Sequence, residues 1–491
     1  MSTMGENSKS WHASAAARAE QVVTFLAVAW VTLLPWLIGG RLWWVQALGA
    51  GLGLLALLVA LTVRANRRSL VRFPVFWLGL LFFAYVACQA LNPWMGANLM
   101  ESSVDVWAMD MLTHIDWLPR GVRADYFEMN AWRDLVNWAG PWALACAWWM
   151  AARRRRTTWW LWGITLFNGV LTSVEGVANI YRTNNKILWF YVEKGLNDRD
   201  PRAWGAPLNH YMGGFVSANP AAAFLCLSLA AGLALVLRVQ AQAREDGRDT
   251  GFSWVLLVGC AVVLAGIVIS GSRGGLVIGA MIFAAAVLSM VWAGWKGGGF
   301  SFGRLLPAAI LLLLLAGGGA ILFMGVKPKA VTKLVDSLPE LKTDPRLQLW
   351  KVTVDMIREQ PWLGYGAGSY RYISPGFFYR EKMFFDPAAL GWLSERANYA
   401  HSDWLQFPME YGAIGAAFLL AMLLYWLVKI WLLAPWLSGA TELALLGCGG
   451  TLLHATFDFP LHNVAVLTLW AVLLVSAVKA GELNRLRGDR P

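Results

Sequence analysis

The chain has 491 residues, of which 58% are hydrophobic and 14% are charged, and its formal net charge is +11. A soluble domain carries about 25% charged residues, so the composition excludes an ordinary soluble protein and indicates one embedded in a membrane. The positive charge first suggests nucleic acid. However, Lys and Arg are clustered between apolar runs, as in a multi-spanning membrane protein, so no nucleic-acid partner is expected.

Segments of about 20 apolar residues can cross the hydrocarbon core as helices. The first such segment follows a polar tail at 1–20 and is expected to be a retained span rather than a cleaved signal. The fourth is short, and the sixth contains Pro220. The twelve predicted spans are 21–39, 42–63, 73–91, 137–152, 158–180, 213–237, 252–270, 274–295, 305–325, 406–431, 438–457 and 461–480.

Basic residues follow every second predicted span, in connections short enough for the positive-inside rule to apply. This alternation predicts that both termini, including the tail at 481–491, lie in the cytoplasm. The clusters are Arg64, Arg67, Arg68 and Arg72; Arg153 to Arg156; Arg238, Arg244 and Arg248; Lys296 and Arg304; and Lys479, Arg485, Arg487 and Arg490.

The longer connections fall on the opposite, outer side. They are the loops 92–136 and 181–212, within spans one to nine at 21–325, and a large loop at 326–405 before spans ten to twelve at 406–480. The predicted fold is an all-α polytopic membrane protein with about twelve transmembrane helices. Because ATP is absent outside, an enzyme there needs a substrate that already carries its activation. The five Cys residues show no CxxC spacing, so neither a metal site nor a disulfide is expected.

The stretch SGSRGG, 270–275, forms the outer turn between the seventh and eighth predicted spans. Its glycines permit a tight turn and a close approach of backbone N–H groups to a ligand. The next helix directs its positive dipole end outward, and Arg273 adds a fork of donors beside Ser272. These features suit a phosphate, although an interfacial arginine can equally extend to lipid headgroups.

In the large outer loop, the stretch DPRLQLWKVTVDMIREQPWLGYGAG predicts a short amphipathic helix, with Asp344 as N-cap and Pro345 at the first position. Its apolar residues at helical spacing are Leu347, Trp350, Val354 and Ile357. Arg346 lies in the first turn, where the helix dipole disfavours a cation. A partner or ligand for Arg346 is therefore expected, although an exposed arginine loses little stability there.

The stretch ANYAHSDWLQFPMEYGAIG places His401 just before span ten and Glu410 at the edge of that span. An ionisable residue in such a position is a functional candidate. Asp403, two residues after His401, can orient the imidazole ring. The structural alternative for His401 is a hydrogen bond to a backbone carbonyl.

The outer turn LLHATFDFPLHN brings His454, Asp458 and His462 to the same side, and Asn219 lies near the outer start of span six. Asp458 can simply cap its turn, and Asn219 can satisfy the backbone near Pro220. The predicted topology nevertheless gathers all of these residues on one face, which favours a functional site.

Five stretches, in this order, resemble the O-antigen ligase and polymerase superfamily of bacterial envelope glycosyltransferases. They are GGFVSANPAAAFL, SGSRGG, RLQLWKVTVDMIREQPWLGYGAGSY, AHSDWLQFPMEYGAIG and DFPLHN, within residues 210–465. The resemblance implies a helical bundle in the inner membrane with a periplasmic active site. It implies transfer of a saccharide from undecaprenyl diphosphate to an acceptor hydroxyl, without cofactor, metal or nucleotide.

By the same resemblance, Arg273 and Arg346 match the arginines that hold the diphosphate, and His401 matches the catalytic base. Family members often have Asn after this histidine, where the chain has Ser402. The supporting candidates are Ser272, Asp403, Glu410, Asp458, His462 and Asn219.

The implied chemistry is physically reasonable. A diphosphate leaving group is already activated, so catalysis chiefly requires positioning and neutralisation of the departing charge, which suits arginine. A histidine can accept the proton of the attacking hydroxyl near neutral pH. Direct attack inverts the anomeric carbon, whereas a carboxylate nucleophile, Glu410 or Asp458, would give retention.

The same features fit ligation of a glycan to lipid A-core, polymerisation of lipid-linked repeat units of O-antigen, capsule or exopolysaccharide, and transfer to protein Ser or Thr. Outer-loop aromatic side chains can stack on sugars or anchor at the interface. They are Trp107, Trp117, Trp132, Trp189, Trp204, Tyr211 and Tyr370. A transporter or lipid flippase predicts charged or broken helices at mid-membrane, and only Glu175 lies well inside an apolar run.

Overall fold

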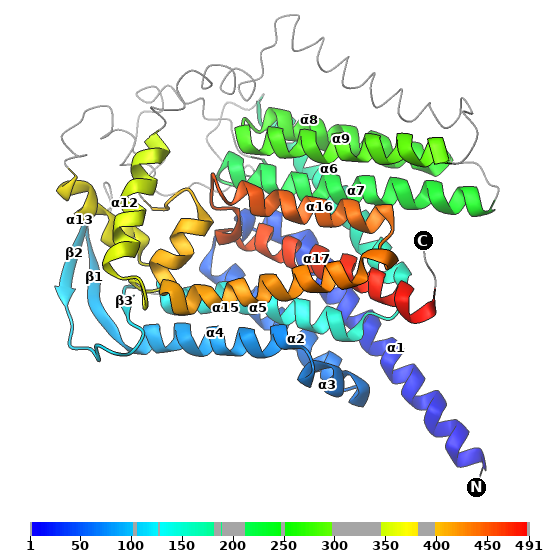
Figure 1. Cartoon of the computed structure of the whole chain (residues 1–491), viewed down its shortest axis with the longest axis horizontal. Coiled ribbons are helices and arrows are strands. Elements are labelled where there is room, and N and C mark those ends of the chain that lie inside the picture. The colour runs from blue at the N-terminus through cyan, green and yellow to red at the C-terminus, as the bar shows by residue number, and fades with distance from the viewer. Residues whose placement is uncertain are drawn as a thin grey trace, which may run out of the picture.

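The structure, a computed structural model of the chain, describes residues 2–101, 106–125, 128–180, 188, 212–246, 251–296, 345–381 and 398–488. Most of its helices run side by side and form a bundle (Figure 1). In the first part of the chain they are α1 (Ser2–Leu33), α2 (Trp43–Leu61), α3 (Arg64–Val71), α4 (Pro74–Leu91), α5 (Ala131–Ala151) and α6 (Arg155–Ile180). They continue with α7 (Ala218–Asp246), α8 (Gly251–Ile269), α9 (Arg273–Lys296), α15 (Asp403–Leu433), α16 (Gly439–His454) and α17 (Val464–Arg487).

Every predicted span that falls on described residues coincides with a helix, whereas the ninth, 305–325, lies outside them. Within the described residues, eight helices are long and apolar enough to cross a membrane, and α8 is a shorter apolar helix over Ser253–Ile269. The chain is therefore a multi-pass membrane protein. The sixth predicted span begins later than expected, at Ala218, so Pro220 lies in the first turn of α7, where its missing N–H breaks no helical bond.

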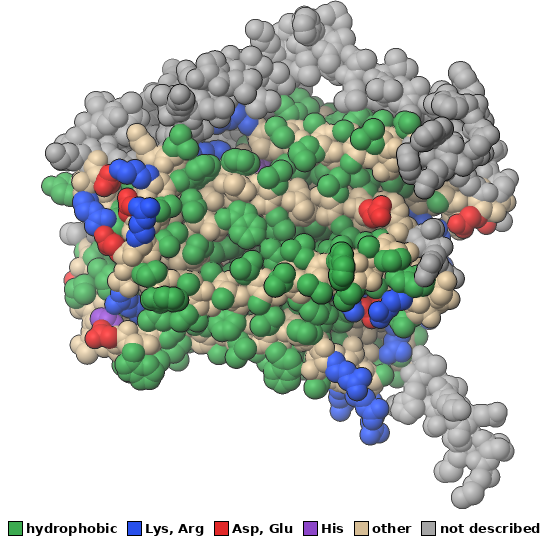
Figure 2. All heavy atoms as spheres, viewed as in Figure 1, with side chains coloured by type: hydrophobic (Ala, Val, Ile, Leu, Met, Phe, Trp, Pro, Cys, Tyr) green, Lys and Arg blue, Asp and Glu red, His purple; other side chains and the backbone are tan. Residues whose placement is uncertain are grey.

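The centre of the bundle is formed by α7 and α17. In the apolar segment of α7, 94% of the residues are buried, and in that of α17, 89% are buried. Trp162 of α6 donates its indole N–H to Ser476 of α17 at 2.9 Å within this core. The face in Figure 2 is covered by hydrophobic side chains in its middle, with Lys and Arg nearer the ends. A bundle that is apolar outside as well as inside suits a lipid surrounding.

The expectation of an all-α fold is wrong for the segment 92–136, which contains a three-stranded sheet. Its strands are β1 (Pro93–Glu101), β2 (Val106–Met111) and β3 (Gly121–Arg123). The central strand β1 pairs antiparallel with β2 and parallel with β3. Ala97 and Val122 face a buried core from this sheet. Strands this short give little periodic signal, and the acidic residues between them favour a loop in the sequence.

The sheet packs with α12 (Pro345–Glu359) and α13 (Tyr370–Arg380) into an outer unit that has a core of its own. α12 confirms the predicted helix and its first residue, but a different face is buried. Leu347 is 42% exposed, whereas Leu349, Val352 and Met356 lie in the core of the outer unit. The predicted face is partly exposed because α12 packs mainly on α15 and α13, a placement that helical spacing alone does not reveal.

The outer unit lies at one end of the bundle, which we call the outer end, and both termini lie toward the other (Figure 1). This arrangement agrees with a topology in which the long connections and the termini lie on opposite sides. The assignment of the termini to the cytoplasm stays a prediction. Several predicted features lie outside the described residues: Asp344, residues 189–211 of the second outer loop, and residues 297–344 and 382–397.

α15 is interrupted at Gly412, whose φ of 65° and ψ of −179° are not helical. The segment 361–366, between α12 and α13, docks at the interruption, and the Tyr365 N–H donates to the Met409 carbonyl at 3.0 Å. A Cβ on Gly412 would overlap the carbonyl oxygen of Trp362, so only glycine fits. The outer end of α15 is therefore held by the outer unit.

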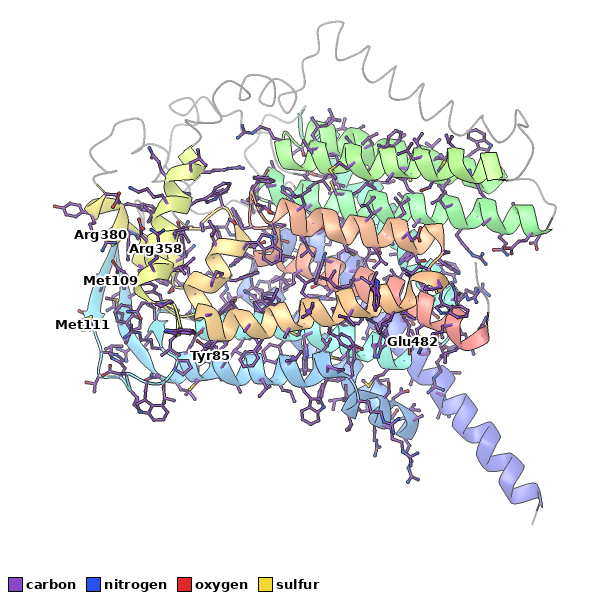
Figure 3. The ribbon with its side chains drawn as sticks, in the orientation of Figure 1. Tyr85, Met109, Met111, Arg358, Arg380 and Glu482 are labelled. Atoms are coloured by element: carbon purple, nitrogen blue, oxygen red, sulfur yellow. The ribbon has the colours of Figure 1, made fainter. Side chains whose placement is uncertain are left out.

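Tyr85 of α4 lies between its helix and α15 and supports the same junction (Figure 3). Its hydroxyl is 2.7 Å from the Tyr411 carbonyl and 3.0 Å from the Leu363 carbonyl. One turn further along α4, the Gln89 amide donates to the Glu410 carbonyl at 3.2 Å. These side chains supply hydrogen bonds to backbone groups that a buried loop would otherwise leave without partners.

Candidate active site

Asp458, in the turn between α16 and α17, is the centre of a polar cluster at the outer end of the bundle. The residue is 2% exposed. Asn219, at the start of α7, donates a hydrogen bond from Nδ2 to Oδ2 of Asp458. Arg346 Nη2 lies 3.7 Å from the same oxygen, and His401 Nδ1 lies 3.5 Å from Oδ1. Four residues singled out in the sequence are thus brought together from four separate segments of the chain.

His401 has an unusual backbone conformation, with a φ of 51° in the left-handed region. Such a φ is uncommon for a residue other than glycine and is often found at functional sites. The His401 carbonyl accepts a hydrogen bond from Trp350 Nε1 at 3.2 Å, and its ring packs edge-on against Phe459 at 4.9 Å. Because Nδ1 faces Asp458, Nε2 is the ring nitrogen directed away from the carboxylate.

The expected pairing of Asp403 with His401 is wrong. Asp403 Oδ1 lies 2.5 Å from His462 Nδ1, and Oδ2 accepts from the Leu461 N–H at 2.9 Å. As the first residue of α15, Asp403 also donates its backbone N–H to the Asp458 carbonyl at 3.1 Å. Asp403 and His462 therefore fasten the turn that carries Asp458.

Arg346 has the partner that its position in the helix predicted. Its Nη1 donates to the Phe457 carbonyl at 2.8 Å, so the guanidinium spans both the backbone and the Asp458 carboxylate of one turn. The Arg346 side chain is 19% exposed. The guanidinium is thus fixed in orientation and still accessible from the outer end.

The SGSRGG stretch forms a tight turn, with Gly271 at a φ of 76°. The Ser272 hydroxyl accepts from the Gly275 N–H at 3.1 Å and so caps α9. A Cβ on Gly274 would lie 2.8 Å from His454 Nε2, and one on Gly275 would overlap the side chain of Ala222. These glycines allow α9 to approach α16 and α7 closely, a packing role that the sequence did not indicate.

Arg273 is the first residue of α9 and is half-buried. Its neighbour Gly274 packs against His454, and the charges of Asp458 and Arg346 act on that histidine. His454 is 2% exposed and connects the Arg273 turn with the Asp458 cluster. The sequence placed His454 on the correct side but gave it no role, because an isolated histidine at a helix end carries no spacing signal.

Glu410 is 1% exposed and lies in the outer end of α15. Its Oε1 accepts hydrogen bonds from Gln406 Nε2 at 3.0 Å and from the Tyr370 N–H at 3.4 Å. The carboxylate thereby holds the loop that leads into α13. With Asp458 at 2% exposure, neither carboxylate considered as a nucleophile reaches the surface of this structure.

Of the aromatic residues considered for sugar stacking, Tyr370 is excluded because it is fully buried, with its hydroxyl 3.4 Å from Thr353 Oγ1. Trp117 and Trp132 are 78% and 46% exposed. The side chains of Trp107, Trp189, Trp204 and Tyr211 lie outside what the structure describes. Across the described ranges, no group of three His, Cys, Asp or Glu side chains is placed to hold a metal ion.

The pKa values of Asp458 and of nearby His462 are displaced in opposite directions. Burial alone would raise the pKa of Asp458, but hydrogen bonding and charge from His401, with the charges of Arg346 and His454, hold it below its ordinary value. Burial alone would lower the pKa of His462, but Asp403 and the nearby carboxylates raise it above its ordinary value. The cluster therefore favours an ionised Asp458 and a protonated His462.

The fold and the cluster define a multi-pass membrane protein with an Asp–His–Arg centre at one end of its helical bundle. The family model for O-antigen ligase matches residues 258–420, so that segment of the chain is similar to O-antigen ligases. The family consists of membrane enzymes that transfer lipid-linked glycans. The matched segment contains Arg273, Arg346 and His401, whereas Asn219 and Asp458 lie outside it. No curated protein matches the chain.

Proposed function

We propose that the protein transfers a glycan from an undecaprenyl-diphosphate carrier to an acceptor hydroxyl at the periplasmic face of the inner membrane. The acceptor that we favour is lipid A-core, which makes the protein an O-antigen ligase. The observation that carries the proposal is the approach of His401 and Arg346 to one carboxylate, Asp458, within a chain that contains a segment similar to O-antigen ligases.

His401 acts as the general base. Asp458 favours the imidazole tautomer with its proton on Nδ1 and stabilises the imidazolium once it forms. Nε2 then removes the proton from the acceptor hydroxyl as that oxygen attacks the anomeric carbon, and the bond to the diphosphate breaks. The Asp458 carboxylate is suited to this role because its lowered pKa keeps it ionised at neutral pH.

Arg346 and Arg273 neutralise the charge that develops on the departing diphosphate. The two contacts of Arg346 with the 457–458 turn fix its guanidinium before substrate binds, which reduces the reorganisation required during the reaction. The burial of Glu410 and Asp458 disfavours a covalent glycosyl intermediate, so we expect inversion at the anomeric carbon. No step of this mechanism requires a metal.

A polymerase that joins lipid-linked repeat units, or a transferase to protein Ser or Thr, would use the same donor chemistry. Transport is less favoured. Glu175, the ionisable residue well inside an apolar run, accepts a hydrogen bond from the Gly213 N–H at 2.7 Å and so has a structural partner.

The test uses purified protein, an undecaprenyl-diphosphate-linked glycan and lipid A-core, with transfer followed by gel mobility and mass. His401→Ala is expected to lower the rate by about 10²- to 10⁴-fold, the contribution of a positioned general base. His114→Ala is the matched control, because His114 lies in the outer loop beside Asp116 and not in the cluster. Transfer by His401→Ala at the wild-type rate would exclude this base.

Arg273→Lys and Arg346→Lys retain the charge and remove the paired donors, so both are expected to raise the KM for the donor and lower kcat. If both variants transfer glycan normally, the diphosphate is held elsewhere. If the purified protein joins lipid-linked repeat units and transfers none to lipid A-core, the proposal of a ligase is replaced by that of a polymerase.

A further inference from the structure

A turn at residues 115–118, between strands β2 and β3, displays large apolar side chains. The Leu118 N–H donates to the Ile115 carbonyl at 3.2 Å, so Asp116 and Trp117 occupy the tip of a closed turn. Trp117 is 78% exposed and Ile115 is 48% exposed. Large apolar side chains that are exposed side by side indicate a surface that meets a partner.

The 115–118 turn is fastened to the outer end of α4. Asn92, the residue that follows α4, donates from Nδ2 to the Ile115 carbonyl at 2.9 Å. Its Oδ1 accepts from the Ile115 N–H at 2.8 Å. Asn92 is buried, so water does not compete freely for these bonds. The turn therefore keeps a fixed place beside the last residue of a helix that is long and apolar enough to cross a membrane.

The exposed side of α4 leads directly to this turn. Only 33% of the apolar segment of α4 is buried, and Trp77, Leu81 and Leu91 are among its exposed side chains. The helix lies on the outside of the bundle, with the strands at its outer end (Figure 1). A membrane-crossing helix with this much exposed apolar surface faces lipid. Since the 115–118 turn adjoins Leu91, its apolar side chains continue the lipid-facing surface to the level at which the bilayer ends.

The chain that follows the turn is held firmly within the outer unit. Arg120 lies over the Trp94 ring at 4.8 Å, and Trp94 Nε1 donates to the Tyr365 carbonyl at 3.3 Å. A Cβ on Gly366 would overlap the Cα of Gly121, so the two backbones are in contact. The turn is thus joined to the loop that docks at the interruption of α15. It cannot withdraw its apolar side chains from the surface without breaking these contacts.

Asp116 limits how deeply the turn can enter the bilayer. Its side chain is 91% exposed, and its Oδ1 lies 3.0 Å from His114 Nε2. A carboxylate in the hydrocarbon core is costly. Tryptophan, in contrast, is enriched at the boundary between hydrocarbon and headgroups, because its ring is apolar and its N–H is polar. A tip that combines Asp116 with Trp117 therefore suits the headgroup level.

We propose that the 115–118 turn inserts Trp117 and Ile115 into the headgroup region of the bilayer beside α4 and so anchors the outer unit to the membrane surface. The partner is the lipid of the surrounding bilayer. This inference is independent of the donor and the acceptor assigned above. Its consequence is that the outer unit, which carries Arg346 on α12, is held at a fixed height above the bilayer.

The experiment measures the depth of the turn in phosphatidylcholine nanodiscs by electron paramagnetic resonance of a nitroxide on one cysteine. Cys88 is replaced by Ala throughout, because it is half-buried whereas the other four native cysteines are buried. The label is attached in Ile115→Cys, which leaves Trp117 intact, and in Trp117→Cys. Tyr379→Cys is the control, since Tyr379 is 65% exposed on α13, at a different side of the outer unit.

The nitroxide is relaxed by collision with oxygen, which concentrates in lipid, or with a nickel chelate, which stays in water. Labels at 115 and 117 are expected to respond more to oxygen, and the label at 379 more to the nickel chelate. A stronger response to the nickel chelate at both 115 and 117 overturns the anchor. Protection of both labels from both reagents only after glycan is added also overturns it, and assigns the turn to sugar binding.

A second measurement tests whether the anchor steadies the outer unit. Trp117→Glu adds charge where the ring enters the interface, so it is expected to speed proteolysis between α12 and α13 severalfold. Trp117→Phe keeps an aromatic ring and is expected to be cleaved at the wild-type rate. Equal cleavage of wild type and Trp117→Glu contradicts the anchoring of the outer unit.

Discussion

The carboxylate beside the His401 ring belongs to Asp458, with Oδ1 3.5 Å from Nδ1, although Asp403 is only two residues from His401 in the chain. Asp403 instead pairs with His462 at 2.5 Å. The site therefore contains two Asp–His pairs with different positions. The first faces the proposed reaction, and the second lies behind it and holds the turn.

Asp458→Asn removes the negative charge from the centre of the cluster and keeps nearly the same volume. Because the amide can donate to His401 Nδ1 and so favour the wrong tautomer, glycan transfer is expected to fall by about 10²- to 10⁴-fold. Rates are measured with saturating donor and acceptor. Asp355→Asn on α12 is the control, because Asp355 pairs with Arg358 and lies outside the cluster. Equal activity of the two variants would contradict the role assigned to Asp458.

His462 gives the fold a defined pH dependence. Its folded pKa is raised, so its stabilising contribution is fully present below the unfolded value of about 6.5 and is lost as pH rises through the folded pKa. Thermal unfolding midpoints are therefore expected to decline across that window in wild-type protein. In His462→Gln the decline is reduced. An unchanged slope in the variant would show that other groups control the stability in this range.

The start of α9 tolerates no side chain at Gly275. A Cβ there would overlap that of Ala222 in α7, so Gly275→Ala is expected to destabilise the protein by about 1–3 kcal/mol through overpacking. Gly449→Ala in α16 is the matched control, because no atom lies within 4 Å of its added Cβ. The control is expected to be neutral or stabilising, since alanine favours a helix over glycine. Thermal or denaturant unfolding compares the two.

Tyr85 supports the junction between the outer unit and α15. In Tyr85→Phe, the Tyr411 carbonyl loses the phenol O–H that lies 2.7 Å from it, which costs about 1–3 kcal/mol for a buried group. Because His401 lies two residues before the start of α15, transfer is expected to weaken together with stability. Tyr379→Phe is the control for removal of a hydroxyl, since Tyr379 is 65% exposed. Protease sensitivity between α12 and α13 reports the local loosening.

Much of the helical bundle could be predicted because long apolar runs have few alternatives in a bilayer. The gathering of Asn219, Arg346, His401 and Asp458 also followed from topology, since charge alternation assigns each turn to a side. What joins them could not be predicted in detail. The partner of His401 comes from a distant turn, and proximity along the chain favoured Asp403 instead.

The outer unit was least predictable because its core is assembled from short elements. The strands around Ala97 and Val122 contribute few residues each, and their burial depends on α12 and α13, which follow much later in the chain. Likewise, glycine at 274 and 275 predicted a phosphate-binding turn, and this stays a prediction. The structure adds a packing role, since the missing Cβ atoms permit contact with His454 and Ala222, and sequence alone does not identify such neighbours.

The interruption of α15 at Gly412 also separates two mechanical environments. Beyond it, the helix continues among lipid-facing side chains such as Leu420, Leu424 and Trp431, which are 60%, 56% and 75% exposed. Before it, the helix is clamped by α4 and the outer unit. A helix that continued unbroken would pass every tilt imposed by the bilayer directly to His401. We therefore expect the joint at Gly412 to reduce how far a tilt of the lipid-facing part of α15 displaces His401.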